Sequence, residues 1–333
     1  MTRRLFNKLS SPLISILILI LLVGCHTILP NHTSTTGSFP EENCRFVKHA
    51  MGDTCVPQNP ERLVTISDFT FYHALFLGFE PIGNAFDDWR DRVPAYLANK
   101  KQLIESIEGL GQGSQPNIEK ILKLKPDLII SWGDILSAYP VLSEIAPTVI
   151  DEISTNGNDG WREHFHFVAK ALGKEDAERQ AWENYDKRIH NLKESMGERY
   201  KNKTISIMTV AHDFENHASS RNSFVGSILS DVGLTLSNFQ DIDGGGGWIQ
   251  YSSEKFVNFF NGDILFVTIA GEADRTMLNE LQSEPLWEKL NAVKEGRVYV
   301  VDSLTWQGGN LFAANAVIDD LYKYLINTPW PSQ

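Results

Sequence analysis

The three cysteines of this 333-residue chain stand in contexts that predict their chemistry. Cys25 directly follows a nearly unbroken apolar run over residues 13–23, and three basic side chains lie among the first eight residues. A basic start, a short apolar core and a small residue before a cysteine are typical of a bacterial lipoprotein leader. We therefore expect removal of residues 1–24 and acylation of the Cys25 thiol, which would anchor the protein to a membrane. The alternatives are a plain signal peptide or an anchor helix with a chance cysteine, and the very apolar core favours general secretion over twin-arginine export.

Cys44 and Cys55 are predicted to form a disulfide. They lie in two short strand-like segments with a glycine-containing turn between them, and export would take them to an oxidising compartment. Two free thiols are the alternative. No second pair of ligands accompanies them, so a metal site is not expected.

The sequence contains none of the common catalytic motifs. It has no Gly-x-Ser-x-Gly elbow, no His-Glu-x-x-His and no Walker loop, and no Lys-Ser/Thr follows the glycine run at 244–247. The nine histidines are scattered, and His164 and His166 would point to different faces of a helix. The formal charge is −12, and loss of the leader would make it −15, which disfavours nucleic-acid binding. These features favour a binding protein without cofactor or bound metal over an enzyme.

Apolar runs rich in β-branched residues alternate with helical patterns along the chain. Such alternation is typical of parallel sheets covered by helices. Between residues 161 and 200 there is no proline, which predicts one long or once-interrupted helix. We expect a tether over 25–43, an N-terminal α/β lobe over 44–158, an interlobe helix over 159–200 and a C-terminal α/β lobe over 201–333.

A weak internal repeat accompanies this division. Residues 117–120 (Asn-Ile-Glu-Lys) precede Asp127 and an apolar strand, and residues 252–255 (Ser-Ser-Glu-Lys) precede Asp263 and another. Acidic residues are favoured at helix starts for electrostatic reasons alone. Coincidence and lobe symmetry both remain open at this point.

Several segments together resemble a known family. They are residues 49–52 and 56–64, 75–83, 110–119, 124–129, 292–299 and 316–321. From about residue 45 to 326 the chain resembles the iron–siderophore-binding lipoproteins of bacterial ABC importers. The resemblance implies a class III periplasmic binding protein, in which two Rossmann-like lobes with mostly parallel sheets are joined by one long backbone helix. The ligand would lie between the lobes.

The resemblance also implies the partners. The ligand would be a ferric siderophore whose iron is held by the siderophore itself. The protein would deliver this ligand to an ABC permease, and through the permease it would be an indirect partner of the ATPase. We expect it to be a monomer. Glu119 and Glu254, one in each lobe, match the glutamates that dock related proteins on their permease.

Aromatic and cationic side chains that follow the predicted strands, or lie in segments that could face the ligand across the cleft, are the candidate ligand contacts. They are Phe69, Trp89, Arg90, Arg92, Trp132, Arg221, Trp248 and Trp306. Many relatives carry an arginine in the loop that is written here as residues 111–115; Gln112 or Gln115 would have to replace it. The nearest alternative is cobalamin or haem in the same fold, with Tyr72, His73 or His212 as haem ligands; an enzyme or a structural lipoprotein is a more distant one. The siderophore class and the target membrane are not readable from the sequence.

Overall fold

The computed structural model describes residues 44–86, 93–133, 135–151, 160–211 and 217–327, which belong to one compact unit spanning residues 36–333. The predicted leader, tether and Cys25 lie outside the described residues, as do Trp89, Arg90 and Arg92. None of the described helices is long and apolar enough to cross a membrane.

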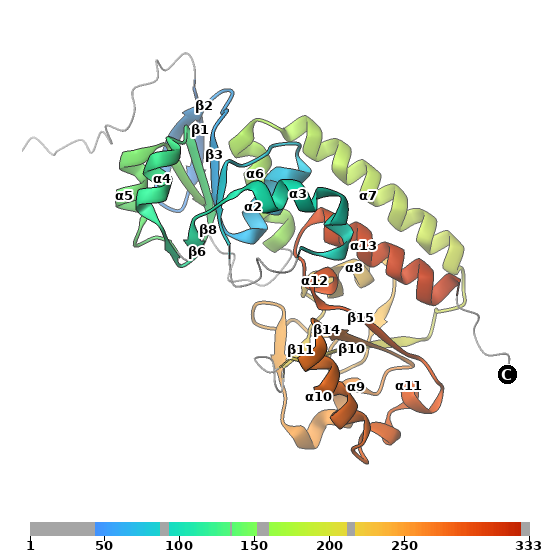
Figure 1. Cartoon of the computed structure of the whole chain (residues 1–333). Helices are drawn as coiled ribbons and strands as arrows, with labels where there is room; N and C mark the ends of the chain where they lie inside the picture. Colours follow the sequence, from blue (N-terminus) through green and yellow to red (C-terminus); the bar gives the residue numbers. More distant parts are fainter. Residues whose placement is uncertain (1–43, 87–92, 134, 152–159, 212–216, 328–333) are drawn as a thin grey trace, which may run out of the picture. The chain divides into compact units, whose positions relative to one another are not determined.

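This unit contains two separate main sheets, one in each half of the chain, as the sequence predicts (Figure 1). The N-terminal sheet has the order β5 (Glu108–Gly109), β4 (Gly83–Ala85), β3 (Leu63–Ile66), β8 (Leu128–Trp132) and β9 (Thr148–Asp151), and all its neighbours are parallel. All four residues of β3 are buried. Strands buried on both faces are apolar throughout rather than alternating, which is why these runs are readable from the sequence.

The C-terminal sheet is mostly parallel. Its order is β13 (Trp248–Gln250), β11 (His217–Ser219), β10 (Thr204–Thr209), β14 (Ile264–Ile269) and β15 (Val298–Asp302), and β12 (Thr235–Leu236) also pairs with β10. The pairs β10–β14, β14–β15 and β10–β12 are parallel, whereas β11 and β13 are antiparallel. The predicted class, α/β with two mostly parallel sheets, is confirmed.

Helices follow or separate these strands. They are α2 (Asp68–Phe76), α3 (Lys101–Ser106), α4 (Ile118–Leu124), α5 (Tyr139–Ile145), α6 (Gly160–Leu172), α7 (Glu175–Met196), α8 (Phe224–Val232), α9 (Phe256–Phe260), α10 (Glu272–Gln282), α11 (Asn291–Lys294), α12 (Ser303–Trp306) and α13 (Leu311–Leu321). The 3-10 turns are η2 (Ala95–Lys100), η4 (Ser253–Lys255) and η5 (Trp287–Lys289), and a π-helical turn, η6 (Tyr322–Ile326), continues α13.

Two hairpins lie outside the main sheets. One pairs β1 (Cys44–His49) with β2 (Gly52–Pro57), and a disulfide joins Cys44 to Cys55 with their Cα atoms 5.6 Å apart. The Ala50 N–H donates to the Ile150 carbonyl, which ties this hairpin to β9. The other pairs β6 (Gly111–Gln112) with β7 (Gln115–Pro116).

The internal repeat corresponds to equivalent places in the two sheets. Asp127, before β8, accepts the backbone N–H groups of Glu61 and Arg62 ahead of β3. Asp263, before β14, accepts the Thr204 N–H at the start of β10. In each lobe a carboxylate thus fastens the start of one strand to its parallel neighbour, which favours lobe symmetry over coincidence.

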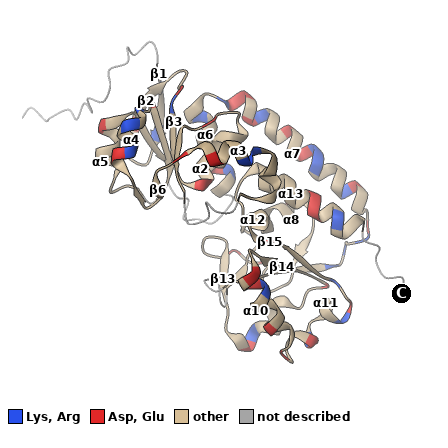
Figure 2. Ribbon diagram, in the orientation of Figure 1, with Lys and Arg blue, Asp and Glu red and all other residues tan. Residues whose placement is uncertain are grey.

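The helical connection between the sheets is interrupted once. Helix α6 ends before Gly173, which has φ +64°, and α7 begins at Glu175. A left-handed residue such as this glycine ends a helix without steric cost. Of the two predicted forms the interrupted one is correct. Positions of Lys, Arg, Asp and Glu are spread along the ribbon of α7 (Figure 2).

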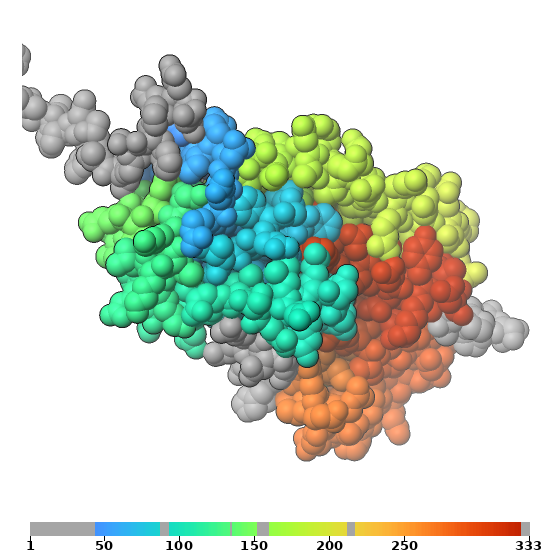
Figure 3. Space-filling view, turned by 45° about the horizontal axis from the view of Figure 1, so that its top comes forward, coloured from blue at the N-terminus to red at the C-terminus, as the bar shows by residue number. Residues whose placement is uncertain are grey.

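The last helix links the C-terminal sheet to the N-terminal one. Helix α13 packs against α2 and η2, with the rings of Phe312 and Phe76 4.6 Å apart. Figure 3 shows the teal surface of η2 and α3 beside the red surface of α13. One hydrophobic core includes Ile130 of β8, Tyr185 of α7 and Phe266 of β14. The two sheets are therefore joined by continuous packing as well as by the chain.

Candidate ligand-binding site

A cavity of about 290 Å³ is lined by residues from both sheets and from the elements that follow them. Its lining consists of Phe69, Trp132, Gly160, Trp161, Ser219, Asn222, Ser223, Phe224, Val225, Gly246, Trp248, Trp306, Gln307 and Gly309. Four of these are predicted ligand contacts, namely Phe69, Trp132, Trp248 and Trp306. Apolar walls with a few polar groups are typical of sites for small organic ligands.

The N-terminal wall consists of two rings in edge contact. Phe69 lies in the first turn of α2, directly after β3, and Trp132 is the last residue of β8. Their ring centroids are 4.6 Å apart and their planes are nearly perpendicular, at 88°. Because β3 and β8 are parallel neighbours, their carboxyl ends meet at one edge of the sheet, where ligands of α/β proteins bind.

Trp306 contributes to the opposite wall and is held firmly. Its side chain is 0 % exposed, its ring lies 4.4 Å from that of Phe266, and its indole N–H donates to Asp320 at 2.9 Å. Burial raises the pKa of Asp320 although this hydrogen bond acts in the opposite direction. The indole is thus largely a core side chain that reaches the cavity. Trp248, at the start of β13, is half-buried.

Gly309 brings the two walls into contact. A Cβ atom added to Gly309 would lie 2.4 Å from Cε1 of Phe69, and its φ of +58° is in the left-handed region. A side chain here would be strained and would displace the Phe69 ring. This glycine therefore sets how closely the segment between α12 and α13 approaches Phe69.

Several polar and aromatic lining residues escaped the sequence analysis. Trp161 lies in the predicted helical connection, yet it lines the cavity and donates its indole N–H to Ser227 at 3.3 Å. Asn222 and Ser223 line the cavity and immediately follow the predicted contact Arg221. Gln307 directly follows Trp306 and donates to Thr209 at 3.1 Å. Closeness in sequence to a predicted contact is the available signal for Asn222, Ser223 and Gln307, whereas Trp161 has no such signal.

The predicted cations do not appear in the described lining. Arg221 is exposed and pairs with Asp243, Nη2 to Oδ1, at 3.2 Å, and with Asp241 at 3.7 Å. Two carboxylates thus already offset its charge. Gln112 and Gln115 are exposed in the β6–β7 hairpin and are not lining residues of this cavity.

The candidate haem ligands differ in position. The side chain of His73 is fully buried on α2, and burial, with the neighbouring His164, lowers its pKa well below the usual value. Burial also raises the pKa of Tyr72, and His212 lies outside the described residues. Within the described part of the chain, no group of three or more His, Cys, Asp or Glu side chains could hold a metal ion.

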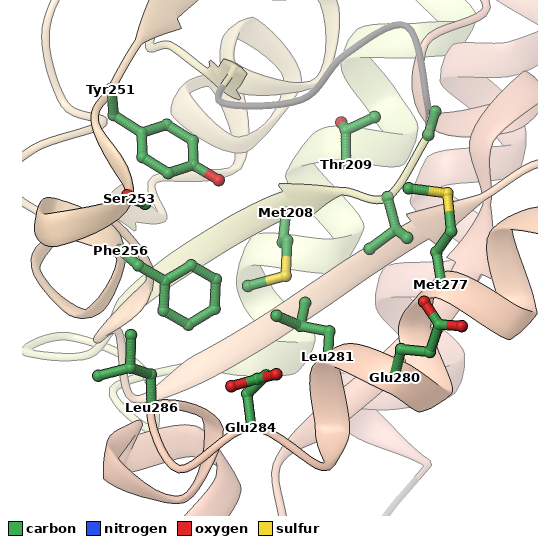
Figure 4. A pocket seen from close by; sticks show the side chains of 12 residues that line it. Met208, Thr209, Tyr251, Ser253, Phe256, Met277, Glu280, Leu281, Glu284 and Leu286 are labelled. Carbon is green, nitrogen blue, oxygen red and sulfur yellow. The ribbon is translucent and has the colours of Figure 1, made fainter.

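A second cavity, of about 390 Å³, lies within the C-terminal lobe (Figure 4). Its lining includes Met208 at the end of β10, Phe256 of α9 and Leu281 of α10. Glu280 and Glu284 also line it, and burial raises the pKa of Tyr251 to about 12. All its described lining residues come from one lobe, so this cavity does not meet the expectation of a site between lobes.

The two candidate docking glutamates are exposed in both lobes. Glu119 lies in the first turn of α4, whose N-cap Asn117 accepts the Lys120 N–H. Glu254 lies in η4, just ahead of α9, and no side chain caps that turn. Both carboxylates are therefore accessible, although the local structure around them differs.

Comparison with known proteins gives a consistent result. A family model described as "Periplasmic binding protein" matches residues 70–305. The chain is similar to the probable siderophore-binding lipoprotein YfiY of Bacillus subtilis, with 32 % identity over 90 % of this chain and 93 % of the relative. It is also similar to the Fe(3+)-citrate-binding protein YfmC of the same organism, with 32 % identity over 90 % and 91 %. The structure of Staphylococcus aureus SirA complexed with staphyloferrin B matches with a TM-score of 0.71 and 29 % identity, over 84 % of this chain and 98 % of that one.

Proposed function

We propose that this chain, which belongs to the periplasmic binding protein family, captures a ferric siderophore between its two lobes and delivers it to the permease of an ABC importer. In this proposal residues 44–158 and 201–333 are the ligand-binding lobes and residues 159–200 are the helical connection. The protein acts as a monomer and binds no cofactor, because the siderophore brings its own iron.

One observation carries the proposal. The four predicted aromatic contacts, which lie far apart in the sequence and come from both lobes, line one cavity together with Trp161 and Phe224. A ferric siderophore is bulky and partly apolar, so flat rings that close on it from two sides suit its surface. The names of the relatives, which include siderophore-binding and Fe(3+)-citrate-binding proteins, support the same ligand class.

The anchoring and docking assignments follow from this role. Cys25 is the acylated residue that keeps the exported protein on a membrane near its importer. Glu119 and Glu254 meet basic residues of the permease, one from each lobe. The exposure of both carboxylates supports this assignment, since a buried glutamate would not reach a partner.

Among the described residues, a hydrogen-bonded arrangement resembles a catalytic triad, but its burial disfavours a catalytic role. Asp151, His164 and Thr70 are hydrogen-bonded in the order of a hydrolase triad, at 2.8 and 2.9 Å. A nucleophile must reach its substrate, whereas the Thr70 side chain is 0 % exposed and is not part of the cavity lining. The arrangement therefore suits a structural task better than acyl transfer.

Ligand binding is tested with the purified protein lacking its leader. Tryptophan fluorescence is measured during titration with ferric citrate, a ferric hydroxamate, a ferric catecholate, cyanocobalamin and haemin. We expect saturable quenching by at least one ferric chelate, and a weaker response in Trp132→Ala. Quenching by cyanocobalamin or haemin alone would replace the proposed ligand, and no response to any compound would refute capture.

Docking is tested separately by charge reversal. We expect Glu119→Lys and Glu254→Lys to leave the affinity for the chelate unchanged and to reduce iron uptake by whole cells about tenfold or more each. Glu144→Lys and Glu288→Lys, at exposed positions in the same two lobes, are the matched controls. Equal uptake in all four variants would refute the assigned docking residues.

A further inference from the structure

A hydrogen-bonded relay lies directly behind the N-terminal wall of the cavity. Asp151, the last residue of β9, is bonded through Oδ2 to Nδ1 of His164 on α6, at 2.8 Å. Nε2 of His164 is 2.9 Å from Oγ1 of Thr70 on α2. The relay thus joins one strand and two helices at the carboxyl edge of the sheet.

Every member of the relay has a partner. Thr70 Oγ1 is also 2.8 Å from Oγ of Ser67, the N-cap of α2. In a neutral His164, Nδ1–H donates to Asp151 and Nε2 accepts the Thr70 hydroxyl, which in turn accepts that of Ser67. The side chains of His164 and Thr70 are 0 % exposed. A buried network whose members are all satisfied holds them in one geometry.

The imidazole of His164 supports the cavity tryptophan. Its ring stacks on that of Trp132 with centroids 5.0 Å apart and planes inclined by only 17°. On α6 itself, the ring of Phe167 lies parallel to it at 6.2 Å. Trp132 of β8 and Asp151 of β9 are directly paired in the sheet, so the first residue of the relay lies beside the residue that carries the indole. The plane of Trp132 is therefore set by a ring that two hydrogen bonds fix in place.

We propose that His164 is a positioning residue for the ligand site: through Asp151 and Thr70 it fixes the plane of Trp132 against which the ligand packs. This inference rests on the proposed function, because it takes Trp132 to be a ligand contact. His164 itself does not line the cavity, and it acts through Trp132.

A double-mutant cycle tests the inference. His164→Phe keeps a flat ring of similar size and removes both hydrogen bonds. We expect it to weaken binding of ferric citrate or ferric staphyloferrin B about tenfold in the wild-type background and to have no further effect in Trp132→Ala. Such non-additivity is the sign that one residue acts through the other. Equal losses in the two backgrounds would overturn the inference.

His73 provides a matched control in the same cluster of rings. It is fully buried 5.3 Å from His164, and neither of its ring nitrogens has a hydrogen-bond partner among the described residues. We expect His73→Leu to retain wild-type affinity. A loss as large as that of His164→Phe would mean that any repacking of this cluster weakens binding, and the relay would have no special role.

A measurement without ligand separates this inference from the proposed function. The near-ultraviolet circular dichroism of Trp132 is isolated as the difference between wild type and Trp132→Phe. The same difference is measured in each variant background. We expect it to change in His164→Phe and Asp151→Asn and to stay as in wild type in His73→Leu. If wild type binds none of the ferric chelates titrated above, the proposed function fails and this spectrum still decides the relay. An unaltered spectrum in both relay variants overturns the relay. Asp151→Asn replaces His164→Phe in the cycle if the latter does not fold.

Discussion

Substitution of Gly309 by alanine should damage the cavity from one defined point. The added Cβ would lie 2.4 Å from Phe69 Cε1, whereas ordinary contacts begin at 3.4 Å, so the ring must move by about 1 Å. The preceding residue, Gly308, is closely packed, since the position that a Cβ would take there is 2.5 Å from Cβ of Ala313 and 2.7 Å from the Leu304 carbonyl oxygen, so this backbone has little room to move. The Phe69 ring is therefore the group that yields.

The magnitude has two parts. A left-handed φ of +58° costs an alanine about 1 kcal/mol relative to glycine. Overpacking against Phe69 adds about 2 kcal/mol. The free energy of unfolding should thus fall by about 3 kcal/mol, and the melting temperature by roughly 6 °C or more. Affinity for the ferric chelate should fall about tenfold, since one wall of the cavity has shifted.

Gly78 supplies the control for backbone strain. Its φ is +79°, and no heavy atom lies within 4 Å of an added Cβ. Gly78→Ala should therefore lose only about 1 kcal/mol and bind the chelate normally. Thermal unfolding and fluorescence titration of both variants separate strain from contact. Equal melting temperatures for the two variants, or unaltered affinity in Gly309→Ala, would show that the Phe69 contact does not shape the site.

Two further predictions concern stability. The Cys44–Cys55 disulfide closes a short loop, with a sequence separation of 11, so Cys44→Ser with Cys55→Ser should lower the free energy of unfolding by about 3 kcal/mol in urea titrations and leave chelate affinity unchanged; an unchanged urea midpoint would contradict this. Burial alone would raise the pKa of Asp263, but the Thr204 N–H and Lys203 outweigh it and hold that pKa below 3.8. The stabilisation from this carboxylate is thus present above pH 3.8 and lost as the pH falls through the lowered pKa, so Asp263→Asn should cost about 1 kcal/mol at pH 7 and progressively less in acid. A cost that stays constant down to pH 2 would refute the assignment.

Much of the fold could be predicted because its strands are buried on both faces. Runs such as residues 63–66 and 264–269 are apolar or β-branched throughout, and helical patterns separate them, which indicates parallel sheets. The break in the connecting helix is not predictable from the sequence, because a glycine within a helical pattern is compatible with either continuation or termination. The positive φ of Gly173, which ends α6, is known only from the folded structure.

The site was predictable only in part. Aromatic residues directly after strands, such as Phe69 and Trp132, could be named because strand ends in parallel sheets face ligands. Trp161 could not, since its helical context gave no sign that the start of α6 borders the cavity. The ion pairs of Arg221 also depend on a turn that brings Asp243 back to it, and sequence spacing does not reveal such contacts.

The hydrophobic core shared by both sheets decides how this protein melts. Residues of α6, α7 and α13 pack in this core together with strands of both sheets, so unfolding of one half would expose apolar surface of the other. Heat should therefore disassemble both halves in a single calorimetric transition, with equal van 't Hoff and calorimetric enthalpies. A ligand bound at the aromatic walls would then stabilise both halves against unfolding, including strands that it does not contact. Amide hydrogen exchange through global unfolding would slow in both halves.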